Sequence, residues 1–265
     1  MKLSRKKLSR ICVDSFIGCW TLAYSSSPRR ILWQQPDVTL FSTGAHSNFQ
    51  NGVLKARFTK SNVAARTKKT LEYFQRRRLP MVWLVDPYST PAGLGRHLEG
   101  TGMICEWGIP CMAMDLAKVR RQARPPGLTI RPVSDIESLR VCVNTAKAGF
   151  DEGKRIPGDP WHEVYISLGF SPAKQWFTGF LNGKPVASSL LLLQGGLATV
   201  WIVATLKEAR GRGIGTAMTR EALLSAKRLG YDFAVIQSSK LGLPIYEKMG
   251  FVEYSKIEKF VWNPE

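Results

Sequence analysis

The feature that most constrains the fold is a stretch without charged residues between Lys184 and Lys207. Its length would suit a transmembrane helix. Gln194-Gly195-Gly196 stands in its middle, however, and paired glycines break a helix and are typical of a hairpin turn. We therefore expect two adjacent strands, Val186–Leu193 and Leu197–Leu206, and no membrane partner.

A basic, glycine-rich segment follows, Arg210-Gly211-Arg212-Gly213-Ile214-Gly215. Apolar residues then recur on one helical face from Ile214 to Leu229, and Gly230 is placed to end that helix. Glycine allows positive φ and a close approach of the backbone to a ligand. The first turn of a helix leaves N–H groups unpaired, and its dipole favours negative charge. Because the two arginines add forked donors, the segment predicts a site for a phosphate-bearing ligand.

The charged and then Pro/Gly-rich segment from Arg120 to Gly127 indicates a domain boundary, with domains at 1–126 and 127–265. In the second domain we expect strands at Leu128–Pro132, Trp176–Leu181 and Phe233–Gln237, helices at Ile136–Ala148 and Pro244–Met249, a polar loop at Gly153–His162 and strand structure at Phe251–Val261.

The first domain resembles the end of the second in the order of its elements. We expect a helix at Val63–Arg78, a strand at Met81–Val85, a short helix at Pro91–Leu98 and a strand at Met112–Leu116. Met81 lies 152 residues before Phe233 (233 − 81), and Pro91 lies 153 before Pro244 (244 − 91). The nearly constant offset indicates two copies of one unit; the alternative is chance similarity of two α/β segments. The counterpart of the glycine turn, about Arg57–Ala64, has no glycine, so the first copy is expected to lack a phosphate cradle.

The net charge of +18 is unevenly distributed. Residues 1–126 carry 21 lysines and arginines against 7 acidic residues, and residues 127–265 carry 17 against 13. A basic half is typical of proteins with acidic partners such as nucleic acid, but it is also typical of a solvated surface. No nucleic-acid-binding module is recognisable, so we favour the solvated surface and expect no nucleic-acid partner.

Five scattered cysteines include no C-x-x-C pair, so we expect neither a metal site nor a disulfide framework, and a reducing cytoplasm. The basic N-terminus is followed by an apolar run from Ile11 to Tyr24, which loosely resembles a signal peptide. Asp14 interrupts the run and no small-residue cleavage site follows it, so we expect an amphipathic helix instead.

The segment Val203 to Ala217 resembles the acetyl-coenzyme A signature of the GNAT N-acetyltransferase superfamily, an Arg/Gln-x-x-Gly-x-Gly/Ala turn between a strand and a helix. Arg210, Gly213 and Gly215 fill that pattern, and Tyr246-Glu247-Lys248-Met249-Gly250-Phe251 resembles the family's second signature. The resemblance extends from Gly127 to the C-terminus, and residues 1–126 are loosely similar to the degenerate repeat of tandem members. It implies an α/β (α+β) fold with a mixed, mostly antiparallel sheet, flanking helices and two related domains.

The resemblance also implies an activity, transfer of an acetyl group from acetyl-CoA to a small-molecule or peptide amine by direct attack. Its implied coenzyme-binding residues are Val203, Ala204 and Thr205 along the strand and Arg210, Gly211, Arg212, Gly213, Ile214, Gly215 and Thr216 around the turn. Tyr246 is the candidate to donate a proton or hydrogen bond to the departing sulfur. The alternative for Tyr246 is a packed aromatic that only holds its helix in place.

The general base stays open. Candidates are Asp159, His162 and Glu163 before the first hairpin and Gln237, Ser238 and Ser239 at a strand end, and a chain of waters would serve equally well. Two other functions also stay open: a catalytically inactive, acyl-CoA-binding regulatory protein, and a nucleic-acid-associated protein that uses the basic half.

Overall fold

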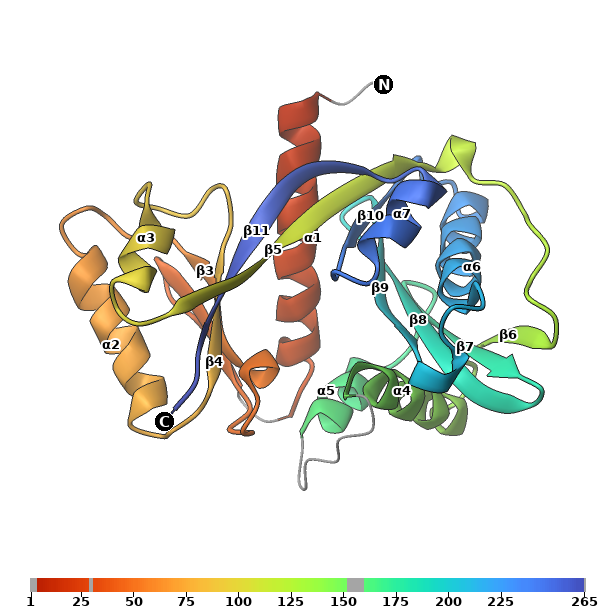
Figure 1. The fold of residues 1–265 in the computed structure, drawn as a ribbon, viewed down its shortest axis with the longest axis horizontal. Coiled ribbons are helices and arrows are strands. Elements are labelled where there is room, and N and C mark those ends of the chain that lie inside the picture. Colours follow the sequence, from red (N-terminus) through yellow and green to blue (C-terminus); the bar gives the residue numbers. More distant parts are fainter. Residues whose placement is uncertain (1–3, 29–30, 152–159, 265) are drawn as a thin grey trace. The chain divides into compact units, whose positions relative to one another are not determined.

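The computed structural model describes residues 4–28, 31–151 and 160–264. Contacts divide the chain into two compact units. The first unit comprises Met1–Ser15 and Cys111–Tyr254, and the second comprises Phe16–Pro110 and Ser255–Glu265. Helix α1 (Arg5–Ser25) and strands β5 (Ile104–Asp115) and β11 (Val252–Trp262) each contribute residues to both units (Figure 1).

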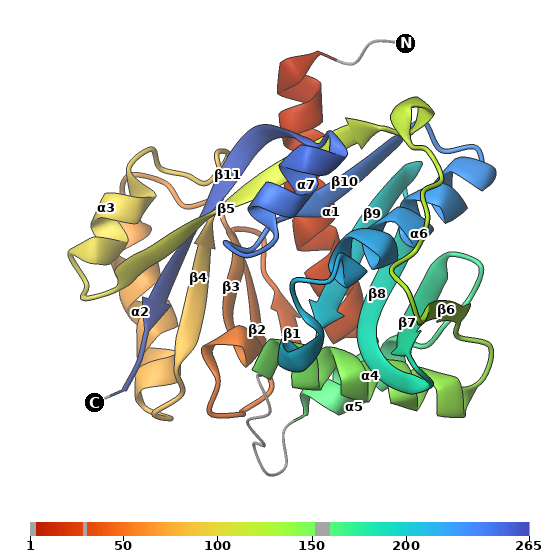
Figure 2. The same cartoon turned by 45° about the vertical axis from the view of Figure 1, so that its right-hand side comes forward.

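The first unit has a mixed sheet in the order β5-β10-β9-β8-β7-β6. Its further elements are β6 (Leu128–Pro132), α4 (Ile136–Asp151), α5 (Trp161–Leu168), β7 (Lys174–Leu181), β8 (Lys184–Gln194), β9 (Leu197–Thr205), α6 (Ile214–Arg228), β10 (Phe233–Gln237) and α7 (Leu243–Met249). Strands β9 and β10 are parallel and the other neighbours are antiparallel. Helices α4 and α6 both pack on β8 and β9, from opposite faces (Figure 2).

The predicted hairpin is confirmed, because the uncharged stretch forms β8 and β9 joined through Gly195 and Gly196. Among the residues placed in the structure, no helix combines the length and apolar character that a membrane span needs. Helix α6 buries Ile214, Met218 and Ala222, as its periodicity predicts. Leu229 differs from that prediction: it caps the helix and is 51% exposed, because the apolar face ends with the helix at Arg228.

The expected polar loop at Gly153–His162 is wrong at its end, because α5 begins at Trp161. Residues 152–159 lie outside the described part of the chain. Rings of the α5 residues Trp161 and Tyr165 are 4.3 Å apart, and Tyr165 also meets Trp201 of β9 at 5.7 Å. These aromatic contacts stabilise α5 beside β9.

The second unit repeats the same strand–helix–strand order around a core of its own. It contains β1 (Leu32–Gln34), β2 (Val38–Ser42), β3 (Asn51–Ala56), α2 (Val63–Gln75), β4 (Met81–Val85) and α3 (Leu94–Glu99), with strand order β1-β2-β3-β4-β11. Strands β3 and β4 are parallel, and β11 is antiparallel to β4. The sequence had not indicated β1 and β2, which are short.

Strand register supports two copies of one unit. In the second unit Gly52 and Val53 pair with Val82 and Trp83, and in the first unit Ala198 and Thr199 pair with Ala234 and Val235. Both parallel pairs of strands therefore meet at the second and third residue of each strand. The offset is 146 residues for β3 and β9 (198 − 52) and 152 for β4 and β10 (234 − 82).

The last strands of the two copies are exchanged. Cys111–Asp115 of β5 pairs with Gln237–Phe233 of β10, whereas Glu258–Trp262 of β11 pairs with Val85–Met81 of β4. The two pairings correspond residue by residue, since β5 and β11 differ by 147 (258 − 111) and β10 and β4 by 152 (237 − 85). The compact units therefore differ from the consecutive domains 1–126 and 127–265 expected from the sequence.

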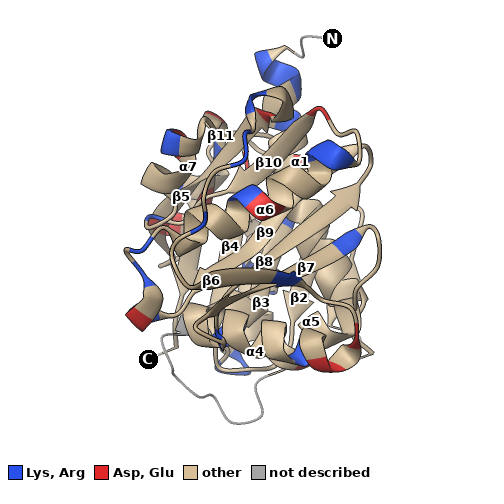
Figure 3. Cartoon of the chain, turned by 90° about the vertical axis from the view of Figure 1, so that its right-hand side faces the viewer, with Lys and Arg blue, Asp and Glu red and all other residues tan. Residues whose placement is uncertain are grey.

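Lysine and arginine residues of the first unit occur on several of its elements in the view of Figure 3, interspersed with acidic residues. Two pairs illustrate this: Arg124 lies 2.8 Å from Glu221 of α6, and Arg140 contacts Glu137 on α4 at 2.5 Å. Such a distribution is typical of a solvated surface.

Candidate active site

Strands β9 and β10 diverge after a short contact. They pair only at Ala198–Ala234 and Thr199–Val235, and β9 then continues to Thr205 with β8 on its other edge. Within the described residues, no strand covers the β10-facing edge of β9 beyond Thr199. Main-chain groups of Val203 and Thr205, both singled out from the sequence, lie on this open stretch, where an extended ligand could pair with them.

A bulge interrupts β9 at the open stretch. Trp201 pairs with Leu190 and Ala204 with Ser188, so Ile202 and Val203 stand opposite the single residue Ser189. Ile202 has φ of 50°, a rare conformation for a buried β-branched residue, and the Ser188 hydroxyl donates to its carbonyl at 3.0 Å. Bulges and strained residues are enriched at active sites, where they redirect the backbone. Sequence reasoning missed this feature, because no glycine marks it.

The glycine turn leads into α6, as the sequence predicts. Gly211 and Gly213 have φ of 76° and 74°, and Gly213 caps the helix. The first main-chain bond of α6 is donated by Ala217 to Gly213 at 3.0 Å. The N–H groups of Ile214, Gly215 and Thr216 precede that bond and receive no acceptor from the helix itself. The turn therefore presents unpaired donors at the positive end of a helix, which suits a phosphate.

The two arginines of the turn differ in role. Nε of Arg210 donates to the carbonyl of Thr205 at 3.1 Å, and another guanidinium nitrogen donates to the carbonyl of Gly149 at 2.9 Å. Arg210 therefore fastens the turn to the ends of β9 and α4, and its side chain is committed to main chain rather than directed to a phosphate. Arg212 is exposed beside the unpaired N–H groups.

The Ala204 side chain faces α4. A Cβ placed on Gly149 of α4 would lie 2.9 Å from the Ala204 methyl group, so the helix approaches the strand through this glycine. Ala204 can therefore serve a ligand only through its main chain. Gly215 is placed differently, since its Cα faces the Thr205 hydroxyl with room for a methyl group at 3.7 Å.

Tyr246 lies on α7 and is buried against α6. Burial raises the pKa of its hydroxyl to about 12, and a hydrogen bond with Thr219 of α6 opposes that shift. Thr219 in turn donates to the carbonyl of Gly215 at 2.9 Å, within the first turns of the helix. The phenol is thus held next to the glycine turn in its neutral, proton-bearing form. Sequence reasoning placed Tyr246 on this helix but missed Thr219.

Gly242 sets the position of the Tyr246 ring. A Cβ at Gly242 would lie 2.7 Å from Cε2 of Tyr246 and 3.2 Å from Oγ of Ser238. This is closer than carbon atoms pack, so a larger residue would displace the ring or the turn.

The structure narrows the list of candidate bases. Ser238 donates to the carbonyl of Ser239 at 2.8 Å, and the Ser239 hydroxyl accepts from Gly242 N at 3.1 Å, so both shape the turn before α7. His162 lies on α5, where burial and then Lys147 and Arg140 lower its pKa. Glu163 is next to it on α5, and Asp159 lies outside the described residues. Gln237, at the end of β10, faces the backbone of Cys12.

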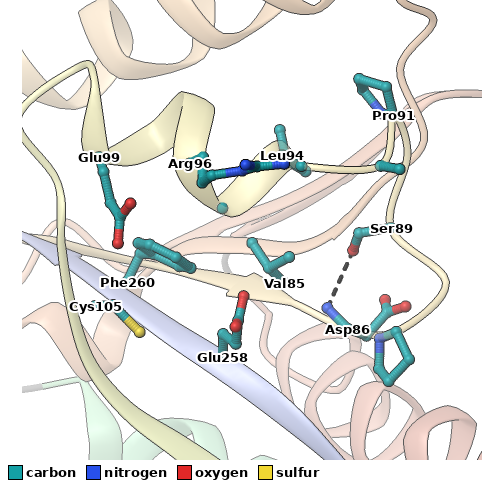
Figure 4. A pocket seen from close by; sticks show the side chains of 14 residues that line it. Val85, Asp86, Ser89, Pro91, Leu94, Arg96, Glu99, Cys105, Glu258 and Phe260 are labelled. Carbon is teal, nitrogen blue, oxygen red and sulfur yellow. Dashed lines mark hydrogen bonds between the residues drawn. The ribbon is translucent and has the colours of Figure 1, made fainter.

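The second unit has a cavity of about 420 Å³ beside α3. Its lining includes Asp86 and Ser89 after β4, Arg96 of α3 and Glu258 of β11 (Figure 4). Asp86 is committed to structure, because its carboxylate lies 3.1 Å from the Arg57 guanidinium and accepts from Tyr88 N at 2.6 Å. None of the lining residues belongs to the glycine turn, β9 or α7, so the cavity takes no part in the site described above.

Comparison with known proteins agrees with this geometry. Residues 173–253 match the family model of the acetyltransferase (GNAT) domain. No curated protein matches the sequence.

Solved structures of GNAT proteins share the fold over most of the chain. A GCN5-related N-acetyltransferase from Kribbella flavida is 17% identical with a TM-score of 0.66, and 95% of each chain is covered. One from Sphaerobacter thermophilus is 16% identical with a TM-score of 0.65, over 86% of this chain and 77% of that one. A tandem GNAT protein from the clavulanic acid biosynthesis pathway is 11% identical with a TM-score of 0.61, over 99% of this chain and 97% of that one.

At these identities the structural likeness concerns the fold: a mixed, mostly antiparallel sheet with flanking helices, as expected from the sequence. The family model covers the part that contains β8, β9, the glycine turn, α6 and α7. Residues 173–253 therefore match the acetyltransferase (GNAT) domain, and the chain as a whole shares the fold of GNAT proteins.

Proposed function

We propose that the protein is an N-acetyltransferase that transfers an acetyl group from acetyl-CoA to an amine of a small molecule or peptide. The observation that carries this proposal is the continuity of the open β9 edge with the unpaired N–H groups at the start of α6. An extended amide-containing arm and a diphosphate, joined in that order, match such a surface.

We expect the turn to bind acetyl-CoA in its present conformation. Main-chain groups from Val203 to Thr205 would pair with the pantetheine arm, and N–H groups from Gly211 to Thr216 would bind the diphosphate. Cβ atoms placed on Gly211 would meet nothing within 4 Å, so the turn is open to a ligand. Arg210 would act as a support for the turn, through Thr205 and Gly149.

Two groups of the protein would promote acetyl transfer: main-chain amides that stabilise the thioester oxygen and a tyrosine that stabilises the departing thiolate. Main-chain amides at the Ile202–Val203 bulge are suited to stabilise negative charge that develops on the thioester oxygen as the neutral amine attacks. Tyr246 would stabilise the departing thiolate. Since its pKa is about 12 and a thiol has a pKa near ~8.5, complete transfer of the phenolic proton to sulfur is unfavourable, and a hydrogen bond is the expected contribution.

A coenzyme-release assay over a panel of small amines, aminoglycosides and peptides tests the proposal. We expect acetyl-CoA to raise the thermal stability of the protein and at least one amine to release free coenzyme A. Stabilisation without release by any amine would favour the acyl-CoA-binding regulatory alternative. Absence of both effects would contradict the proposed function. All five cysteines are free thiols, so we further propose that the protein works in a reducing compartment such as the cytoplasm.

A further inference from the structure

Gln237 has a buried polar atom without a partner. Its Nε2 donates to the carbonyl of Cys12 in α1 at 3.0 Å, whereas its Oε1 is buried and accepts no hydrogen bond from any described residue. The assignment of the two amide atoms follows from Cys12, because a carbonyl can only accept. A buried carbonyl oxygen left unpaired is costly to folding, and in an active site it points to a missing ligand.

The position of Gln237 relates this atom to the bulge. The last paired rung of the two parallel strands is Val235 with Thr199. Two residues further along each strand stand Gln237 and Trp201, and Ile202 of the bulge follows next. Gln237 therefore faces the level of the bulge from the other side of the diverging strands.

The side chain also lies on the face away from α6. Ala234 and Ile236 of β10 pack in the core cluster with α6, so the alternation of strand residues turns Gln237 to the opposite face. Cys12 of α1 lies on that face, and so does Thr199, whose hydroxyl lies 2.6 Å from that of Ser15 of α1. A ligand bound to the α6 turn and one that contacts Gln237 would thus approach the bulge from different faces.

We propose, on the basis of the proposed function, that Oε1 of Gln237 accepts a hydrogen bond from the nitrogen of the acceptor amine. An amide cannot remove a proton at neutral pH, so Gln237 would hold the amine rather than act as its base. One N–H bonded to Oε1 leaves the lone pair of a neutral amine free to attack the thioester carbon. The C–N bond forms, the C–S bond breaks, and the surplus amine proton leaves to water. The acceptor is therefore an amine with at least one N–H on the reacting nitrogen.

Two variants separate this role from the structural bond to Cys12. Gln237→Met and Gln237→Glu both remove the Nε2 donor, but only Gln237→Glu keeps an oxygen at the Oε1 position. We expect kcat/KM for the amine to fall about tenfold or more in Gln237→Met. In Gln237→Glu we expect kcat/KM to stay at least about fivefold higher than in Gln237→Met. The dissociation constant for acetyl-CoA and the thermal midpoint are measured for both variants.

Each outcome decides a different question. Equal losses in the two variants, or wild-type transfer by Gln237→Met, would overturn the role of Oε1 while acetyl transfer itself stands. A wild-type protein that neither binds acetyl-CoA nor transfers acetyl groups would overturn the proposed function and this inference with it. An unchanged acetyl-CoA affinity together with a selective loss in Gln237→Met supports the inference.

Discussion

The turns after β9 and after β3 occupy corresponding places in the two copies but treat their hydrogen-bond donors in opposite ways. After β9, positive-φ glycines leave the first N–H groups of α6 unpaired. After β3, Thr59 and Asn62 bond to each other: Thr59 N donates to the Asn62 side chain at 2.9 Å, and Asn62 N donates to the Thr59 hydroxyl at 3.2 Å. Val63 N donates to the Thr59 carbonyl at 3.1 Å. The second turn therefore uses the N–H groups of Thr59, Asn62 and Val63 for bonds within the turn, and Val63 is the counterpart of Ile214 in α6.

In the second unit, the strand edge that corresponds to the open edge of β9 is closed. Phe58 N donates to the carbonyl of Thr90 at 3.0 Å and Thr90 N to that of Ala56 at 3.4 Å, while Arg57 pairs with the buried Asp86 at 3.1 Å. The segment after β4 thus takes the place that a pantetheine arm would take after β9. The comparison shows that one fold can either leave the edge of this strand open or close it through a few local hydrogen bonds.

The largest expected effect comes from a charge at the cap of α6. Gly213→Asp keeps a residue type that tolerates positive φ and caps helices, so the fold should persist. Its carboxylate would repel the diphosphate, and we expect acetyl-CoA binding to weaken at least about 100-fold. Asn62→Asp, at the cap of α2, is the matched control and should leave the affinity unchanged. Calorimetric titration measures both, and near wild-type affinity in Gly213→Asp would exclude the proposed diphosphate site.

A second substitution tests whether the ion pair between Arg57 and Asp86 in the second unit stabilises the fold. Asp86→Ala leaves the partly buried Arg57 without its carboxylate, and we expect the free energy of unfolding to fall by about 3 kcal/mol. The affinity for acetyl-CoA should not change, because these residues belong to the second unit. Denaturant titration measures the first quantity. If Asp86→Ala had unaltered stability but bound acetyl-CoA more weakly, the second unit would contribute to ligand binding rather than to stability, contrary to the comparison above.

Tyr246→Phe addresses the reacting end of the first unit. We expect kcat to fall about 10- to 100-fold, with the dissociation constant for acetyl-CoA within about twofold, because the hydroxyl acts on the departing sulfur. The matched control is Arg96→Ala: Arg96 stands four residues before Gly100, the cap of α3, as Tyr246 stands four before Gly250, the cap of α7. Steady-state kinetics of both variants measure these effects. If Tyr246→Phe were as fast as wild type, Tyr246 would have only a packing role.

The smallest expected effect concerns pH. Since burial raises the pKa of Tyr246 to about 12, its phenol stays neutral through pH 9, and the stability difference between wild type and Tyr246→Phe should be constant there. Above the unfolded value near ~10 the unfolded chain loses its proton first, so wild type should lose stability relative to Tyr246→Phe from about pH 10 to 12. Urea unfolding at pH 7, 9 and 11 measures the difference. A stability difference that is the same at pH 7, 9 and 11 would show that the phenol is solvated, because its pKa would then be equal in the folded and unfolded chains.

Local signals made much of the fold predictable. Apolar periodicity and Gly-Gly placed the β8–β9 hairpin, and glycines bounded α6 and α7 at nearly the correct residues. Helix α5 escaped notice because it is short and owes its place to the Trp161–Tyr165–Trp201 packing. Strand β5 was recognised only at its end, since Gly108 and Pro110 interrupt the pattern of its first half. These misses share one cause: tertiary contacts overrode weak local preference.

The sequence by itself determined the glycine turn at the start of α6, because positive-φ glycines and a helix start are encoded within a few neighbouring residues. Only the tertiary structure decided the exchange of β5 and β11, the bulge at Ile202, the commitment of Arg210 to backbone carbonyls and the unpaired oxygen of Gln237. Each of these depends on which distant segment supplies a hydrogen-bond partner. Strand pairing and side-chain partners are long-range choices, and the chemistry of one residue does not specify them.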